Sequence, residues 1–406
     1  MKTIKNRERE VPFVFVHGVN NRRDEEYLRE EQIRAAFLSQ IVAAEIKIDP
    51  DSPVFSPYWG GDGVSFRRNL SVVPGETSVE SFGSQILTLS PSLGIGIADG
   101  QVNKDDSLDA LAKKNPSVAV DILFDNIIQQ AHTNDDIASV AKAFQRAQSA
   151  LSVQDSQWLK ASNLKSFEDD VLDVLSPPSN ALGAETYGAQ AIYRMLVEAI
   201  SRTVLAVPEA LAFAVSAPLR KPGTHAFATF TGDVFAYLSE RGDGNEPGLI
   251  ASKVITDLRE AKKLARSKEE PLVVISHSFG GEIVYDILTH YAPEIEVDVW
   301  ITVGSQVGLF EEMSLLWTSA GRIDKNAATN QSVMSPKNVK RWINIIDSND
   351  VLGFLIEPIF TPHSTGTVKD YLYNTAFPIY GAHSGYFKWP SFYKRMAKRL
   401  REGINP

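Results

Sequence analysis

Three residues whose side chains together can do nucleophilic chemistry occur in the order serine, aspartate, histidine. Ser278 is followed 72 residues later by Asp350, and His383 lies a further 33 residues along the chain. A serine hydroxyl becomes a nucleophile when an imidazole takes its proton, and a carboxylate fixes the tautomer of that imidazole and supports its charge. The three residue types therefore predict acyl transfer through a covalent intermediate on Ser278.

The residues around Ser278 predict a strand, a sharp turn and a helix. Residues 272–275 form a short apolar run rich in β-branched side chains, which is typical of a buried parallel strand, and apolar residues recur at helical spacing from Ile283. The intervening SHSFG, residues 276–280, is a variant of the G-x-S-x-G nucleophile elbow with Ser276 in place of the first glycine. The free N–H groups of the following helix would favour negative charge beside the serine. An ordinary connection with a chance serine is the alternative interpretation of this short pattern.

The acid and the base each have a rival in the sequence. Asp350 follows a predicted strand at residues 339–346, but Asp347 lies three residues before it and is an alternative acid. Asp350 is favoured because a small apolar pair, Val-Leu, follows it. His363 is an alternative to His383 as the base, but it lies in a loop rich in proline and threonine.

The remaining histidines do not suggest a metal site. His17 is expected to support a loop after the first strand, and His277 to pack beside the elbow. No two histidines have zinc-ligand spacing with a carboxylate partner, so we predict neither a metal nor a cofactor.

The elements that must position these residues alternate between strands and helices. Residues 11–16, VPFVFV, predict a buried strand, a helix is expected to open at residues 24–26, and residues 52–59 predict a strand that two prolines push to an edge. A helix over about 248–267 and a strand over 297–305 continue the pattern, and a final helix is expected from about Pro390. This order is typical of βαβ units and a parallel sheet.

Four segments make the chain resemble an α/β-hydrolase of the lipase and esterase type. They are HGVNN at 17–21, SHSFGG at 276–281, WINIIDSNDVLGF at 342–354 and AHSGYF at 382–387. The resemblance covers residues 11–60 and 225–406, and it implies the α/β-hydrolase fold, a mostly parallel sheet flanked by helices. It further implies Ser278 as nucleophile, His383 as base and Asp350 as orienting acid. The backbone N–H groups of Val19 and Phe279 would form the oxyanion hole, each donor being worth ~3 kcal/mol.

The resemblance divides the chain into three parts. Residues 1–60 would be the first part of the hydrolase core, residues 61–224 a mainly helical insertion, and residues 225–406 the rest of the core. The insertion matches no family known to us and is expected to pack over the site as a cap or lid, with an independent interaction domain as the alternative. Within it, residues 189–219 predict an amphipathic helix, because charged residues interrupt the apolar run that a membrane span would need.

Composition excludes several classes of function. The 406-residue chain carries a net charge of −9, which argues against nucleic acid as the main partner. It contains no cysteine, so a thiolate nucleophile and disulfides are excluded. The charged N-terminus offers too few successive apolar residues for a signal peptide, and a cytoplasmic location is expected.

The predicted function is the hydrolysis of carboxylic esters, with lipid or acyl esters favoured over small soluble esters. Thioesterase and acyltransferase activity on the same residues is one alternative. A non-catalytic protein that binds or signals through the insertion is another. Contact of the insertion with a membrane surface stays open, and the sequence does not indicate an oligomeric state.

Overall fold

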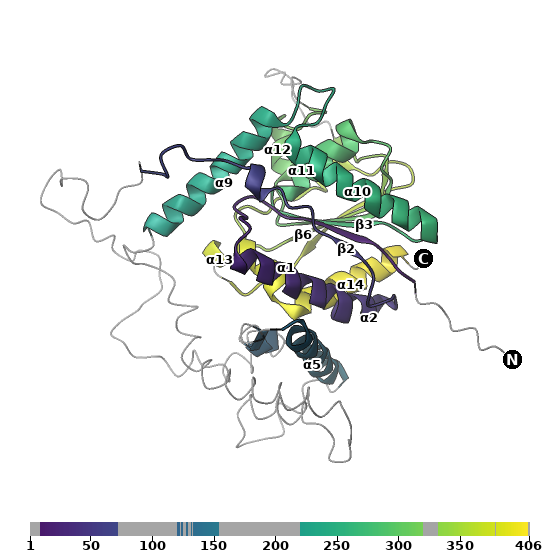
Figure 1. Cartoon of the computed structure of the whole chain (residues 1–406). Helices are drawn as coiled ribbons and strands as arrows, with labels where there is room; N and C mark the ends of the chain where they lie inside the picture. Colours follow the sequence, from purple (N-terminus) through teal and green to yellow (C-terminus); the bar gives the residue numbers. More distant parts are fainter. Residues whose placement is uncertain are drawn as a thin grey trace, which may run out of the picture.

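The computed structural model describes residues 9–71, separate positions between 120 and 131, and residues 133–153, 220–319, 332–377 and 379–404. Its centre is one sheet of six parallel strands in the order β2-β1-β3-β4-β6-β8 (Figure 1). The strands are β1 (Phe13–Val16), β2 (Val54–Phe55), β3 (Val273–His277), β4 (Val297–Val303), β6 (Val339–Ile346) and β8 (Thr367–Leu372). The predicted α/β class with a mostly parallel sheet is thereby confirmed.

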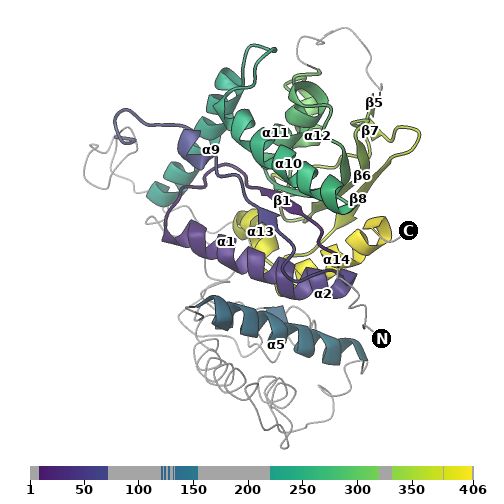
Figure 2. The same ribbon diagram turned by 45° about the vertical axis from the view of Figure 1, so that its right-hand side comes forward.

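Both faces of the sheet are covered by helices, because side chains alternate between two hydrophobic layers along each strand. Phe13 and Phe15 of β1 join one layer, whereas Val14 and Val16 join the other. On the first face lie α1 (Glu25–Phe37), which continues through the π-helical η1 (Leu38–Val42) into α2 (Ala43–Ile46), and α14 (Pro390–Ile404). On the second face lie α10 (Leu249–Lys268) and α11 (Gly280–Asp286), which the π-helical η5 (Ile287–Tyr291) extends (Figure 2).

The remaining elements stand around the edges of these layers. They are the short helices η2 (Gly60–Asp62), α12 (Val307–Glu312), α13 (Ile379–Gly385) and η6 (Tyr386–Lys388), the long helix α9 (Arg220–Glu240), and a separate parallel pair of β5 (Val333–Met334) and β7 (Phe360–Thr361). Of these, α13 lies near the carboxyl ends of the central strands.

The described part of the predicted insertion adds a further layer outside α1 and α14. Its helix α5 (Asn134–Val153) lies beyond them in Figure 2, and Val140 and Phe144 are fully buried. Arg29 of α1 donates to the carbonyl of Ile128 at 2.6 Å, and Asp121 accepts a hydrogen bond from the backbone N–H of Ser391. The apolar side chains of the described part of the insertion therefore share a hydrophobic core with the sheet. The helix predicted at 189–219 lies outside the described residues.

Most predicted elements are found at the expected places. The strand predicted at 339–346 has these bounds in the structure, the strand at 52–59 is the short edge strand β2, and the final helix begins at Pro390. The sequence did not predict β8, in which the adjacent charged residues Lys369 and Asp370 interrupt the apolar pattern. An edge strand needs no continuous apolar run, because one of its sides faces no neighbour in the sheet.

Candidate active site

Ser278 occupies a sharp turn between β3 and α11. Its φ is 52°, in the left-handed region that costs a non-glycine residue about 1–2 kcal/mol. The turn is held by a hydrogen bond from Ser278 N to the carbonyl of Val303 at 2.9 Å and by one from Gly281 N to the carbonyl of Ser278 at 3.0 Å. Backbone strain of this kind is concentrated at functional sites, and here it lifts the serine out of the strand direction.

Gly280 and Ser276, the small residues on either side of Ser278, fit their positions for different physical reasons. A Cβ on Gly280 would lie 2.5 Å from the carbonyl oxygen of Val16, so only glycine lets the helix start this close to β1. Ser276, which stands where the elbow pattern has glycine, is fully buried, and its Oγ accepts a hydrogen bond from Trp300 Nε1 at 2.9 Å. A serine is tolerated there because its hydroxyl has a partner.

The structure brings Ser278, His383 and Asp350 into one hydrogen-bonded line. His383 Nε2 lies 2.8 Å from Ser278 Oγ, and His383 Nδ1 lies 3.0 Å from both carboxylate oxygens of Asp350. Since a carboxylate can only accept, Nδ1 carries the proton and Nε2 is left to accept the serine hydroxyl hydrogen. Ser278 is 2% exposed and the His383 side chain 20%, so the serine is nearly buried while part of the imidazole is accessible to solvent.

Asp350 is held as an ionised acceptor. Its oxygens also accept hydrogen bonds from the backbone N–H of Leu352 and from the hydroxyl of Tyr386, both at 2.9 Å. Burial alone would raise the pKa of this carboxyl, but the hydrogen bond and charge of His383, together with the other two donors, lower the pKa below its usual range. The carboxylate thus stays charged where it can support an imidazolium.

The alternative acid and base are engaged elsewhere. Asp347 is buried, and one of its oxygens accepts hydrogen bonds from both the backbone N–H and the hydroxyl of Thr375 at 2.6 Å. It therefore shapes the loop before Asp350 and does not contact His383. His363 Nε2 lies 2.9 Å from the carbonyl oxygen of Val339, at the start of β6 and away from the strand ends that carry Ser278.

The loop that follows β1 lies directly against the serine. A Cβ on Gly18 would lie 2.6 Å from the Cβ of Ser278. The carbonyl oxygen of Gly18 is within 2.8 Å of His17 Nδ1 and accepts a hydrogen bond from Asn21 Nδ2 at 3.0 Å. Because a trans peptide unit is planar, fixing the Gly18 carbonyl also fixes the N–H of Val19, which points the opposite way.

His17 supports this loop as the sequence predicted. Its ring stacks on Trp59 with centroids 4.9 Å apart, and its Nε2 accepts the backbone N–H of Trp59 at 3.2 Å. Nδ1 therefore carries the proton that is donated to the carbonyl of Gly18. Burial lowers the pKa of His17 to about 4, so the ring stays neutral and keeps this tautomer.

His277 packs beside the turn at Ser278, also as predicted, and contacts His383 itself. Its ring centroid is 5.1 Å from that of His383, and its Nε2 lies 2.9 Å from the carbonyl oxygen of His383. Burial, and then the neighbouring His383, lower the pKa of His277 to about 3. The neutral ring can donate Nε2–H to that carbonyl and so hold the backbone of His383.

Two contributors to the site, Tyr386 and Trp59, were not singled out from the sequence. Tyr386 lies three residues after His383, and Trp59 ends a predicted strand. Their position beside candidate segments was the available signal, but their partners lie about 40 residues away in the chain. Spacing alone does not reveal such contacts.

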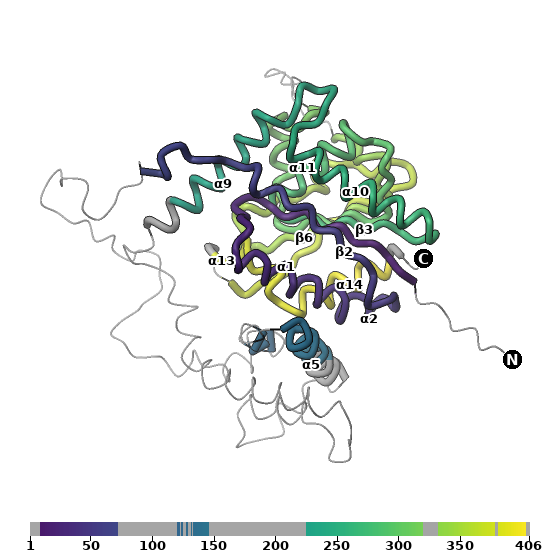
Figure 3. Tube along the Cα trace, in the orientation of Figure 1, coloured from purple at the N-terminus to yellow at the C-terminus, as the bar shows by residue number. Residues whose placement is uncertain are grey.

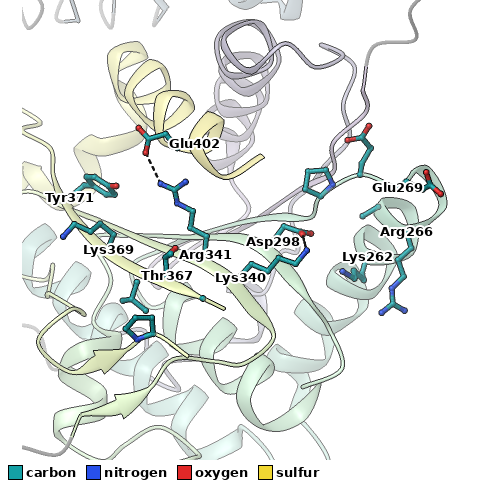
Figure 4. Close-up of a pocket in the computed structure, with 16 residues that line it drawn as sticks. Lys262, Arg266, Glu269, Asp298, Lys340, Arg341, Thr367, Lys369, Tyr371 and Glu402 are labelled. Carbon is teal, nitrogen blue, oxygen red and sulfur yellow. Dashed lines mark hydrogen bonds and ion pairs between the residues drawn. The ribbon is translucent and has the colours of Figure 1, made fainter. Parts of the chain in front are cut away.

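A cavity of about 1090 Å³ lies at the opposite end of the sheet (Figure 4). It is lined by Pro271, Asp298 and Thr367, at the amino-terminal ends of β3, β4 and β8, whereas Ser278 follows the carboxyl end of β3. Lys340 pairs with Asp298 at 2.6 Å and Arg341 with Glu402 at 3.0 Å. Because its lining lies at the amino-terminal ends of the strands, the cavity is separate from the serine site.

Comparison of the chain with models of protein families, with curated proteins and with solved structures finds no match. Among the helices that the structure describes, none has the length and apolar character needed to cross a membrane. The described residues likewise contain no cluster of three or more histidine, aspartate or glutamate side chains arranged to hold a metal ion.

Proposed function

We propose that the protein is a serine hydrolase of the α/β-hydrolase type that cleaves carboxylic esters. The observation that carries this proposal is the line from Ser278 Oγ through His383 to Asp350, with contacts of 2.8 and 3.0 Å, on a serine held at a φ of 52°. The order of the three residues along the chain, and their attachment to a parallel sheet at the carboxyl ends of its strands, support the same fold type.

The reaction would proceed by acyl transfer to the serine and then to water. His383 Nε2 takes the hydroxyl proton as Ser278 Oγ attacks the ester carbonyl carbon, and Asp350 stabilises the imidazolium. The imidazolium then protonates the leaving alcohol as the C–O bond breaks, which leaves an acyl-enzyme. His383 next takes a proton from water, the hydroxide attacks the acyl carbon, and the acid is released as the proton returns to Ser278.

The oxyanion of each tetrahedral intermediate would be stabilised by backbone N–H groups of Val19 and Phe279. Phe279 N–H directly follows the nucleophile at the start of α11, and Val19 N–H is oriented by the fixed Gly18 carbonyl. Within the described residues neither N–H donates another hydrogen bond. One donor of this kind contributes about 2.7–4 kcal/mol to transition-state stabilisation.

An apolar acyl or lipid ester is the proposed substrate class. Support comes from the loop that directly follows the acid, where Val351 is 64% exposed and Leu355 46% exposed beside the buried Asp350. Exposed apolar side chains next to a reactive centre favour the binding of an apolar chain.

The test is hydrolysis of p-nitrophenyl esters from acetate to palmitate, combined with labelling by a fluorophosphonate probe. We expect the wild type to hydrolyse these esters, with a maximum at longer acyl chains, and to be labelled at Ser278. Ser278→Ala should lose about 1,000-fold or more in kcat and lose the label. The matched control is Ser348→Ala, an exposed serine in the loop before Asp350, which should retain both.

The same experiment separates the alternatives. Faster turnover of thioesters than of oxygen esters, or transfer of the acyl group to an added alcohol, would identify a thioesterase or an acyltransferase. A wild type that neither hydrolyses nor is labelled would overturn the catalytic proposal and favour a binding protein.

A further inference from the structure

A fully buried carboxylate of α9 meets the loop that lies against Ser278. Asp233 Oδ2 accepts hydrogen bonds from the backbone N–H of Asn20 at 2.8 Å and from Arg22 Nη1 at 3.0 Å. Its Oδ1 accepts from the backbone N–H of Val64 at 2.8 Å and from Arg22 Nη2 at 2.7 Å. Asp233 is 0% exposed, and the bidentate Arg22 makes this a strong, directional contact.

This carboxylate fixes the second of the two peptide units that flank Val19. The first is held through the carbonyl of Gly18, as described above. In the second, the carbonyl of Val19 accepts from Asn21 Nδ2 at 3.0 Å, while the N–H of Asn20 is held by Asp233. Asn20 itself has a φ of 63°, a left-handed conformation that needs support from its surroundings.

We propose that Asp233 is a positioning residue for the oxyanion hole: through Asn20 and Arg22 it holds the backbone of Val19 so that its N–H faces the reacting carbonyl oxygen. This inference rests on the proposed ester hydrolase function. Asp233 does not touch the reacting atoms, and its effect passes entirely through the loop.

The hydrogen bond between Val64 and Asp233 also links the chain segments at the start and at the end of the predicted insertion. Val64 lies just after the segment that leaves the core, and Asp233 lies on the helix that returns to it. The two segments lie side by side in the Cα trace (Figure 3). The loop at residues 17–22 is thus held in place where residues 61–224 leave the sheet-containing core and where the chain returns to that core.

Asp233→Asn is the informative variant because it keeps the shape of the side chain. Each carboxylate oxygen faces a backbone N–H, from Asn20 on one side and Val64 on the other. An asparagine must turn its NH₂ toward one of these donors, so one hydrogen bond is replaced by a contact between two donors. It also removes the charge that Arg22 neutralises.

The same helix offers a matched control in its contact with Asp286 of α11. Asp286 is also 0% exposed and accepts hydrogen bonds from Tyr237 at 3.0 Å, from Arg241 at 3.2 Å and from the backbone N–H of Trp317 at 2.8 Å. Asp286→Asn therefore disrupts a similar buried ion pair, with Arg241 just after the end of α9, without touching residues 17–22.

The experiment compares steady-state kinetics and inhibition by a trifluoromethyl ketone, whose adduct with the serine carries an oxyanion. We expect Asp233→Asn to lower kcat for a p-nitrophenyl ester about 10- to 100-fold, less than the loss of a whole donor, with KM within threefold of wild type. Affinity for the ketone should fall by a similar factor. Asp286→Asn should lower the thermal unfolding midpoint but leave kcat and ketone affinity within threefold.

Arg22→Lys provides a second variant if Asp233→Asn does not fold. Lysine keeps the charge but cannot donate to both carboxylate oxygens, so we expect a threefold to tenfold loss in kcat and in ketone affinity. Wild-type kcat and ketone affinity in a folded Asp233→Asn or Arg22→Lys variant would overturn the positioning role alone. An inactive wild type that the fluorophosphonate does not label would overturn both this inference and the proposed function.

Discussion

The hydroxyl of Tyr386 donates a hydrogen bond to Asp350 Oδ2 at 2.9 Å and accepts one from the backbone N–H of Asp347 at 2.7 Å. A single phenol therefore links the carboxylate that faces His383 to the loop that carries it. Tyr386 is fully buried, and burial, followed by the charge and hydrogen bond of Asp350, raises the pKa of its hydroxyl, so it remains a donor.

Tyr386→Phe should therefore reduce activity as well as stability. Removing the hydroxyl takes one donor from Asp350 and leaves the buried N–H of Asp347 without an acceptor, which should cost about 1.5–3 kcal/mol of unfolding free energy. We expect kcat to fall about tenfold. The control is Tyr393→Phe, whose hydroxyl donates to the carbonyl of Phe387 at 3.2 Å. Equal kcat in the two variants would contradict a role for Tyr386 in holding the acid.

Substitution of Asp350 should mainly reduce activity, whereas substitution of Asp347 should mainly reduce stability. Asp350→Asn can turn its amide toward His383 Nδ1, which favours the wrong tautomer, so we expect a loss of about 10⁴-fold in kcat with a folded protein. Asp347→Asn must turn its NH₂ toward the donors of Thr375 or toward the backbone N–H of Asn349, and should lower the unfolding free energy by about 1–3 kcal/mol with a much smaller loss in kcat. Kinetics and urea unfolding of the two variants distinguish the assignments, and the reverse pattern would make Asp347 the acid.

Glu282 of α11 should make the protein less stable as the pH rises. It is buried, its Oε2 has no hydrogen-bond partner among the described residues, and burial raises its pKa well above the usual value. The folded state then keeps a proton that the unfolded chain loses above about pH 4.3, so the unfolding free energy falls with rising pH until the folded pKa is reached. Glu282→Gln should remove this decline. Urea unfolding of the wild type and of Glu282→Gln at several pH values tests this expectation. Plots of unfolding free energy against pH that run parallel for the two proteins would contradict it.

His17 should have the opposite effect, between about pH 4 and pH 6.5. Its folded pKa of about 4 lies below the unfolded value of about 6.5, so its contribution to stability is lost as the pH falls through that window. Each pH unit in the window should cost about 1.4 kcal/mol of unfolding free energy. His17→Asn keeps a donor for Gly18 but cannot be protonated. It should be less stable at pH 7.5 and show a shallower decline between pH 6 and 5; an unchanged slope would contradict the assignment.

The strands and the candidate residues were the most predictable part of this molecule. Residues 339–346 show a pattern that local backbone preference and burial both favour, and the strand has those bounds. The meeting of Ser278, Asp350 and His383 was predictable because parallel strands end at a common edge, and the structure brings the three side chains together there.

The supporting contacts were not predictable in the same way. Asp233 lies in a helix with no special spacing, and its partners Asn20 and Val64 are 213 and 169 residues away in the chain. Nothing in a local pattern specifies which buried carboxylate meets which backbone N–H. Such contacts depend on how α9 packs, which is a property of the whole fold.

The pairing of β1 with β3 also bears on how the chain is made. Phe13 lies opposite Val273, 260 residues later in the chain, whereas the other described neighbour of β1 is β2, a strand of two residues. At 5–20 residues per second, the apolar run at residues 11–16 would wait on the order of tens of seconds on the ribosome for its main partner. Short apolar β-rich segments without charge are prone to aggregate while unpaired. Assembly of the sheet around β1 therefore has to follow the synthesis of β3, which ends one residue before Ser278.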